Sequence, residues 1–274
     1  MSEQTRNSDV FHTALCSPKR HLMFLKTHKT GSTTVQNVIL RYVDRENLTL
    51  AMPLWDRVTF QDRTYFRTEY VRNYMEEQSY DVMTHHLRFN PRQVRKVLKH
   101  KDTFYFSILR NPVTLMESSY SYFKQDFPAF TLSTSLEDFL NYANIYYDPY
   151  DPRNTRVKNP IWFDFGLDNK VNWSQELYTK AFKAIKKMFH LILISEYFDE
   201  SMILLKEALC WDVDDVITFK HNSRNEKEIK TVELVLKSCG GGFFQIGLLD
   251  GSHVLGGLNK SAEVAGGGSC LLFL

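Results

Sequence analysis

Residues 21–40, HLMFLKTHKTGSTTVQNVIL, constrain the fold of this chain more than any other segment. Leu22 to Leu25 form an apolar run, and a turn that contains Gly31 follows it. Beyond the turn, apolar side chains recur at helical spacing, at Val35, Val38, Ile39 and Tyr42. The pattern predicts a buried strand, a turn and an amphipathic helix that begins near Ser32.

The turn is suited to an anion, because a helix N-terminus offers unpaired backbone N–H groups and the positive end of the helix dipole. A Walker loop requires Gly, four residues and then Gly-Lys-Ser/Thr. Here Lys29 precedes Gly31, and no glycine opens the loop. The order Lys-Thr-Gly-Ser-Thr instead resembles the 5′-phosphosulfate loop of sulfotransferases, which use 3′-phosphoadenosine 5′-phosphosulfate (PAPS) as sulfuryl donor. An ordinary turn with surface lysines is the alternative. The resemblance assigns donor binding to Lys26, Thr27, His28, Lys29, Thr30, Gly31, Ser32, Thr33 and Thr34.

A second strand, turn and helix follows about 80 residues later. Residues 103–109 read as a buried strand, and Asn111-Pro112 supplies an N-cap and a first-position proline for the next helix. Arg110 lies at the joint and Ser118 two turns further on, a spacing that resembles the 3′-phosphate signature of sulfotransferases. An arginine can hold a phosphate by a forked, charge-assisted bond. The alternative is an Arg110 ion pair with a carboxylate and a solvent-facing Ser118.

A third strand, within residues 79–90, ends in His85 and His86 before a helix opened by Asn90-Pro91. Since ligands bind outside the carboxyl ends of parallel strands, we expect Lys29, these histidines and Arg110 to converge on one crevice. A histidine there can be neutral near pH 7 and take a proton from an alcohol. A structural or surface His-His pair is the alternative.

Four blocks of the chain resemble the galactose-3-O-sulfotransferases: residues 24–37, 86–90, 161–169 and 195–201. The resemblance covers about residues 20–225. It implies a P-loop-like three-layer α/β sulfotransferase fold with a central parallel sheet. It also implies a Golgi membrane enzyme, with its domain on the lumenal face, that moves sulfate from PAPS to the 3-hydroxyl of a terminal β-galactose on a glycolipid or glycoprotein glycan.

The expected reaction is a direct in-line sulfuryl transfer without a metal. His86 is expected to deprotonate the galactose hydroxyl, with His85 as the fallback, and Lys29 to neutralise developing charge. Within the resembling blocks, we expect the acceptor to contact Arg88, Trp162 and Asp164. Two alternatives stay open: a P-loop kinase, and a truncated isoform that binds nucleotide or glycan without turnover.

Composition sets broader limits. The net charge of +2 argues against a nucleic-acid partner. No apolar run of about 18 residues occurs, so the family's membrane anchor is not among the predicted elements. Glycosylation triplets begin at Asn47, Asn172 and Asn259. The four cysteines have no metal-like spacing and are interpreted as non-catalytic, with their redox state open. They are Cys16, Cys210, Cys239 and Cys270.

We expect a flexible segment over residues 1–20, one sulfotransferase domain over 21–225 and a poorly ordered Gly-rich tail over 226–274. Residues 143–173 lack helical periodicity and predict a long functional loop. Its aromatic side chains are suited either to stacking on a sugar or to covering the core. They include Tyr146, Tyr147, Trp162 and Phe163.

Overall fold

Four parallel strands form the centre of the molecule. The computed structural model describes residues 16–54, 58–61, 63–172 and 174–218. Within them the sheet order is β2-β1-β3-β4. In register, Leu22 lies opposite Val82 on one side and Phe104 on the other. The strands are β1 (Leu22–Leu25), β2 (Val82–Met83), β3 (Phe104–Leu109) and β4 (Leu191–Ile194). The predicted central parallel sheet is confirmed.

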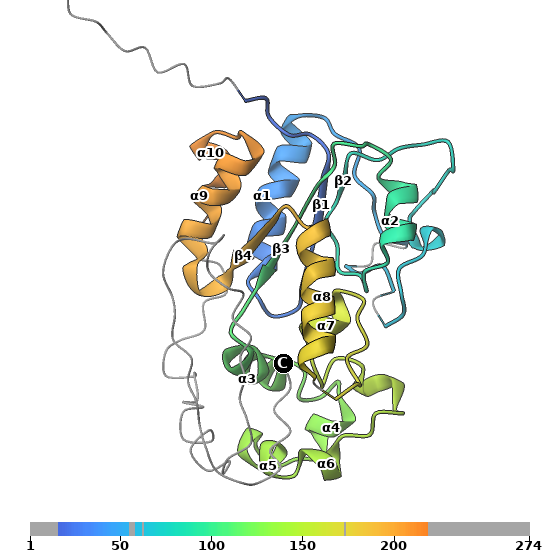
Figure 1. The fold of residues 1–274 in the computed structure, drawn as a ribbon, viewed down its shortest axis with the longest axis vertical. Coiled ribbons are helices and arrows are strands. Elements are labelled where there is room, and N and C mark those ends of the chain that lie inside the picture. The colour runs from blue at the N-terminus through green and yellow to red at the C-terminus, as the bar shows by residue number, and fades with distance from the viewer. Residues whose placement is uncertain (1–15, 55–57, 62, 173, 219–274) are drawn as a thin grey trace, which may run out of the picture.

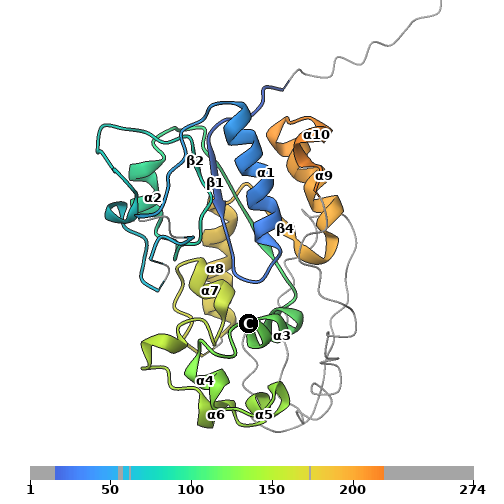
Figure 2. The ribbon, with the colours of Figure 1, turned by 180° about the vertical axis from the view of Figure 1, so that it is seen from behind.

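Helices cover both faces of this sheet and make three layers (Figures 1 and 2). Alternate side chains of β1 serve the two faces, as they do in a strand buried on both sides. Leu22 and Phe24 join the core with α1 (Ser32–Arg45), α9 (Phe198–Leu209) and α10 (Val213–Val216). Met23 and Leu25 join the opposite core with α2 (Pro91–Val97) and α8 (Gln175–Met188). The three-layer α/β architecture is therefore confirmed.

A separate apolar cluster lies beyond the sheet, in the lower part of Figure 1. It is built by α3 (Pro112–Tyr122), α4 (Pro128–Thr131), α5 (Leu136–Asn141) and α6 (Ala143–Tyr146). Phe127, Phe130 and Phe139 are fully buried there. The 3-10 helix η3 (Pro152–Asn154) and α7 (Pro160–Asp164) follow. Two further 3-10 helices are η2 (Thr68–Tyr70) and η4 (Ser195–Tyr197).

The expectation of a loop without helices over residues 143–173 was wrong in part. Short helices interrupt it, and two of them begin with Pro152 and Pro160 at the first turn, where a missing N–H costs nothing. Elements of three to five residues are too short to produce a helical period, which is why the pattern concealed them. Tyr146 and Tyr147 pack on the lower cluster, and Phe163 is buried.

Local capping signals were read correctly. The Asn111 side chain accepts from the Val113 N–H at 2.9 Å and caps α3. The predicted third strand proved shorter than expected, since only Val82–Met83 is regular. The helix opened by Asn90-Pro91 is present as α2.

A disulfide joins Cys16 to Cys210, with Cα atoms 5.8 Å apart. The backbone N–H of Lys19 also donates to the Leu209 carbonyl at 2.9 Å. Residues 16–20, which belong to the segment expected to be flexible, are thus tied to the end of α9. The rest of that segment, the Gly-rich tail, Cys239, Cys270 and Asn259 lie outside the described residues. Among the described helices, none has the length and apolar character needed to cross a bilayer.

Candidate active site

The loop between β1 and α1 is held in shape by its own hydroxyl groups. Thr27 Oγ1 donates to the Ile108 carbonyl at 2.5 Å and lies 2.9 Å from Thr30 Oγ1. Ser32 Oγ donates to the Thr27 carbonyl at 2.6 Å. These three side chains are buried. Their hydroxyls therefore fix the loop, which leaves backbone N–H groups and the lysines as the groups best suited to an anion.

Two residues of the loop have left-handed backbone conformations. Gly31, the N-cap of α1, has φ 75°, and Lys29 has φ 61°. A side chain at Gly31 would make only ordinary contacts, at 3.8 Å from Ser195 Oγ and from the Phe198 ring. The backbone angle, and not lack of space, is what favours glycine there. The Thr34 N–H donates to the Gly31 carbonyl and closes the first turn.

Lys26 is a buried cation at the floor of the loop. Its Nζ donates to Thr33 Oγ1 at 2.8 Å and lies 3.4 Å from Ser32 Oγ. Burial lowers the pKa of Lys26 to about 8, because the charged form loses solvation, and Asp164 offsets part of that effect. Among the described residues this buried ammonium group donates to hydroxyls, which leaves its positive charge available to a bound anion.

Lys29 and Arg110 connect the two predicted phosphate sites. Arg110 donates from its guanidinium to the Lys29 carbonyl at 2.9 Å and to Thr114 Oγ1 at 3.1 Å. The Lys29 ammonium lies 3.6 Å from the centre of the Tyr122 ring, a cation–π contact with α3. Ser118 is buried on the same helix. The structure thus joins the β1–α1 loop to the start of α3, as expected from the strand order.

His86 and His28 stack beside this loop. Their ring centres are 4.0 Å apart with planes inclined by 16°. His86 Nδ1 donates to the Lys26 carbonyl at 2.9 Å, since a carbonyl oxygen only accepts. In neutral His86, Nε2 is therefore the proton acceptor. Burial, aided by the neighbouring His28 and Lys26, holds the pKa of His86 well below its usual value. The ring is neutral at pH 7.

Asp164 anchors the other ring of the stack. Its carboxylate accepts from the His28 backbone N–H at 2.8 Å and lies 2.8 Å from His28 Nδ1. Asp164 is 1% exposed. A carboxylate only accepts, so Nδ1 of His28 carries a proton. Sequence reasoning assigned Asp164 to the acceptor sugar and missed its hold on His28, 136 residues away.

The segment that carries Asp164 also contacts the chain a few residues beyond His86. The Phe89 N–H donates to the Asp164 carbonyl at 2.9 Å. Gly166 has φ 73°, and an added Cβ would lie 2.0 Å from the Phe89 carbonyl oxygen. No side chain fits there, so the glycine allows the two backbones to approach closely. This contact holds the segment that carries Asp164 against Phe89.

His85, the fallback base, has different surroundings. It is buried and lies edge-on to the Phe60 ring, 5.8 Å between ring centres. Burial lowers the pKa of His85 to about 4, with a smaller contribution from Lys26. The catalytic role of His85 stays a prediction.

Arg88 and Trp162 lie beside these residues. The Arg88 guanidinium is 3.9 Å from the Tyr65 ring centre and 4.4 Å from that of Phe163. It also donates to the Leu167 carbonyl at 3.2 Å. Trp162 is half-buried on α7. Their contact with an acceptor stays a prediction, as does that of Asp164.

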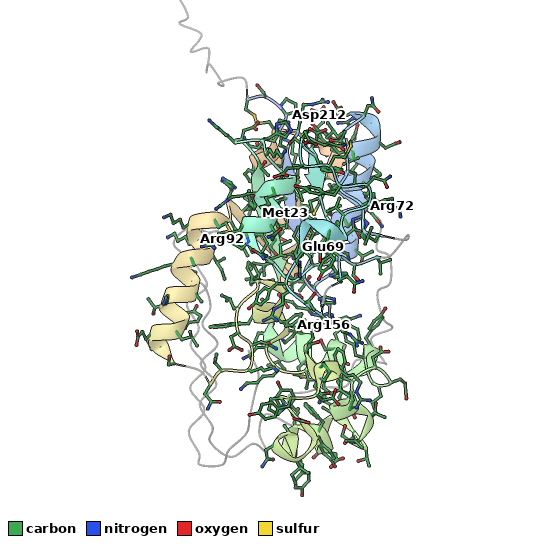
Figure 3. All side chains as sticks on the ribbon, turned by 90° about the vertical axis from the view of Figure 1, so that its right-hand side faces the viewer. Met23, Glu69, Arg72, Arg92, Arg156 and Asp212 are labelled. Atoms are coloured by element: carbon green, nitrogen blue, oxygen red, sulfur yellow. A yellow bond between two sulfur atoms is a disulfide. The ribbon has the colours of Figure 1, made fainter. Side chains whose placement is uncertain are left out.

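Arg156 is a buried cation that sequence reasoning missed. Its guanidinium lies 5.5 Å from the Phe123 ring centre and 5.7 Å from that of Phe127. It is close enough to His86 to lower the pKa of that ring. Figure 3 shows Arg156 where the sheet region meets the lower helices. A lone arginine between polar residues carries no sequence signal, so only the fold reveals it.

Comparison with known proteins places this arrangement in a family. Residues 5–238 match the sequence model described as Galactose-3-O-sulfotransferase. The chain is 42% identical over 217 residues to galactose-3-O-sulfotransferase 2 of Mus musculus, covering 77% of this chain and 55% of that protein. It is 34% identical over 217 residues to galactosylceramide sulfotransferase of Homo sapiens, covering 78% and 51%. The chain spans about half the length of the curated relatives it matches. It belongs to the galactose-3-O-sulfotransferase family.

Proposed function

We propose that this chain transfers a sulfuryl group from PAPS to the 3-hydroxyl of a terminal β-galactose. The observation that carries the proposal is the contact between the two predicted phosphate sites, in which Arg110 donates to the Lys29 carbonyl beside the buried Lys26. A donor with a 5′-phosphosulfate and a separate 3′-phosphate fits two adjoining cationic sites. The acceptors named for the relatives suggest a galactose-terminated glycolipid or glycan.

In the proposed reaction, the side chains supply charge and a proton acceptor. Lys26 and Lys29, with the N–H groups at the start of α1, hold the 5′ end, and Arg110 and Ser118 hold the 3′-phosphate. His86 Nε2 takes the proton of the galactose 3-hydroxyl as the new O–S bond forms and the bond to the nucleotide phosphate breaks. Lys29 neutralises charge on the departing oxygen.

His28 and Asp164 are proposed to support His86 as the base. The stack places the two imidazoles side by side, with Nδ1 of His28 at the Asp164 carboxylate and Nδ1 of His86 at the Lys26 carbonyl. A carboxylate on Nδ1 holds the ring in one orientation, as in a Ser-His-Asp triad. We keep His86 as the proposed base and assign His28 and Asp164 to orienting it and the loop.

We further propose that the domain works on the lumenal face of the Golgi membrane. The Cys16–Cys210 disulfide supports this, because disulfides persist in oxidising compartments and are rare in the cytosol. The exposed Asn47 of an Asn-Leu-Thr triplet is consistent with it.

The test is transfer of radiolabelled sulfate from PAPS by the purified chain to galactosylceramide, lactose and type 1 and type 2 disaccharides. We expect transfer, and near-complete loss of it in Lys29→Met but not in Lys101→Met, an exposed lysine far along the chain. Thermal shift adds a readout without turnover: 3′-phosphoadenosine 5′-phosphate should stabilise the protein more than ATP with Mg²⁺. The reverse order would support a kinase, and stabilisation without transfer would support a binding isoform.

A further inference from the structure

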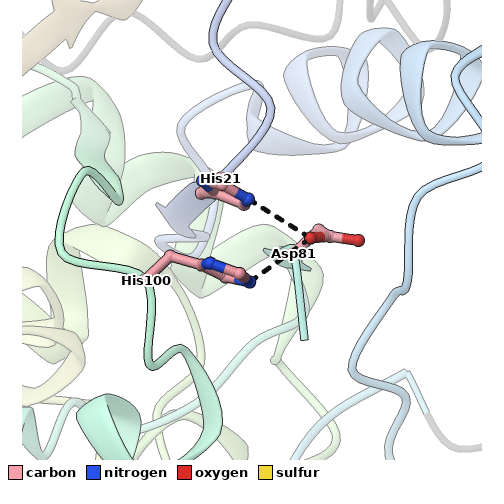
Figure 4. Close-up of side chains that lie close together, drawn as sticks. All are labelled: His21, Asp81 and His100. Atoms are coloured by element: carbon pink, nitrogen blue, oxygen red, sulfur yellow. Dashed lines mark ion pairs between the residues drawn. The ribbon is translucent and has the colours of Figure 1, made fainter. Parts of the chain in front are cut away.

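A second group of polar side chains lies at the opposite edge of the sheet. His21 directly precedes β1, Asp81 precedes β2, and His100 lies in the turn before β3. Figure 4 shows both imidazoles directed at Asp81. Asp81 Oδ1 is 3.4 Å from His21 Nε2 and 3.5 Å from His100 Nε2. The candidate active site follows the carboxyl ends of the strands, so this group, the His21–Asp81–His100 cluster, is separate from it.

The hydrogen bonds around the cluster favour a positive charge between His21 and Asp81, which either a proton or a metal ion can provide. His21 Nδ1 lies 2.8 Å from Asp102 Oδ1 and donates to it, because a carboxylate only accepts. In neutral His21, the lone pair of Nε2 then faces the carboxylate of Asp81. Two acceptors facing each other repel, so a cation between them is favoured. A proton on His21 or a metal ion would meet that need.

The geometry points to a metal ion, and we propose that the cluster binds one divalent late transition-metal ion, with Zn²⁺ as the reference case. Tetrahedral bonds of about 2.0–2.2 Å place donor atoms about 3.3–3.6 Å apart, which matches both separations from Asp81 Oδ1. The three donor atoms all lie within 4.8 Å of one another. Two imidazoles and one carboxylate are ligands that Zn²⁺ commonly takes, with water as the fourth.

The surrounding groups are those that usually support metal ligands. The Asp102–His21 hydrogen bond is a carboxylate–histidine pair of the kind that orients a ligating ring. The second oxygen of Asp81 accepts from the Thr49 N–H at 2.8 Å and from Thr49 Oγ1 at 2.7 Å. Asp81 is therefore fixed with Oδ1 directed at the rings. The cluster thus has three candidate ligands, and hydrogen bonds with Asp102 and Thr49 orient two of them.

One ring must move for the ion to bind. The rings of His21 and His100 stack with centres 3.6 Å apart and planes inclined by 5°. The lone pair of each Nε2 lies in the plane of its ring, so the two lone pairs lie in nearly parallel planes and do not meet at one point. Convergence on one ion needs a rotation of one ring. His100 is the candidate for this rotation, because its side chain is 34% exposed and, among the described residues, makes no bond comparable to that between His21 and Asp102. Binding should therefore break the stack.

The experiment is a titration of the tag-free full chain with Zn²⁺, followed by calorimetry and melting temperature, in a Cys239→Ser/Cys270→Ser background that removes those thiols as ligands. We expect one equivalent to bind and to raise the melting temperature by ~5 °C at 100-fold excess over Kd. His100→Asn and Asp81→Asn should abolish the effect, and Asp102→Asn should weaken binding roughly 10- to 100-fold. Co²⁺ should give the intense visible spectrum of a tetrahedral site, whereas Mg²⁺, which prefers oxygen ligands, should not bind.

The matched control is His190→Asn, which removes an exposed histidine outside the cluster and should leave Zn²⁺ binding intact. The proposal is overturned if Zn²⁺ does not bind at one equivalent, or if binding survives in His100→Asn and Asp81→Asn. Titration of the two rings by NMR without any response to Zn²⁺ would show that a proton alone joins the cluster, and would also overturn it. Circular dichroism of each variant separates loss of a ligand from loss of fold.

Discussion

Within the part of the chain that the structure describes, two pairs of histidines stack, one at each edge of the sheet, and they differ mainly in burial. His28 and His86 stack at 4.0 Å over the buried Asp164. His21 and His100 stack at 3.6 Å near Asp81, and their side chains are 22% and 34% exposed. Each pair combines two imidazoles with a carboxylate. The same groups thus occur in two environments.

The difference in burial separates two kinds of chemistry. In the buried pair, burial keeps His86 neutral, and its Nδ1 bond to a backbone carbonyl leaves Nε2 as a proton acceptor. In the more exposed pair, the side chains of His21 and His100 are 22% and 34% exposed, so water can accompany an ion. The buried pair is suited to moving a proton and the exposed pair to holding a cation.

The largest expected effect is on transfer, when the buried pair loses a ring. His86→Ala should lower kcat about 10²- to 10⁴-fold, because the positioned base is lost. The control is His190→Ala. His190 belongs to neither pair, so its loss should leave kcat unchanged. Added imidazole should restore part of the activity of His86→Ala, an effect that a purely structural role would not produce. Undiminished kcat in His86→Ala would remove the assignment of the base.

A smaller effect is expected on stability, when each pair loses its carboxylate charge. Asp164→Asn should lower the free energy of unfolding by about 1–3 kcal/mol, since the buried His28 N–H groups lose a charged acceptor. Asp81→Asn should lower the free energy of unfolding by about 0.5–1 kcal/mol, because water can replace part of the interaction between the Asp81 carboxylate and its neighbours. Urea denaturation measures both. Equal losses would mean that burial does not distinguish the two pairs.

The smallest expected effect is a pH dependence of donor binding near the buried pair. Burial lowers the pKa of Lys26 to about 8, so its charge is present below pH 8 and is lost as the pH rises through that value. The affinity for 3′-phosphoadenosine 5′-phosphate should then fall by at most about tenfold per pH unit. Calorimetry between pH 7 and pH 9.5 checks this. In Lys26→Met the decline should be absent, and a decline of equal slope in both proteins would contradict the assignment.

Features encoded by neighbouring residues could be predicted from the sequence. The run from β1 through Gly31 to α1 was visible because strand hydrophobicity and helical period are local patterns. Asn111 was recognisable as a cap for the same reason. The convergence of His86 and Arg110 on the β1–α1 loop followed from the rule for parallel strands.

Features that depend on packing between distant segments could not be predicted. The Asp164–His28 contact joins residues 136 positions apart. Nothing in the sequence around either residue indicates the other as its partner. The His21–His100 stack depends in the same way on how the turn before β3 lies against the start of β1. Arg156 was hidden because burial of a cation has no signature in composition. The roles of charged side chains such as Asp164 and Arg156 were therefore the hardest to predict, because their partners come from distant segments.

The Cys16–Cys210 disulfide has a consequence for fragments of this protein. It closes a covalent ring that contains every strand of the sheet, with a sequence separation of 194 residues between its ends. A single proteolytic cut at the exposed Tyr150 would therefore leave the two pieces linked. On a gel, the cut protein would run as one species until a reducing agent is added and as two afterwards.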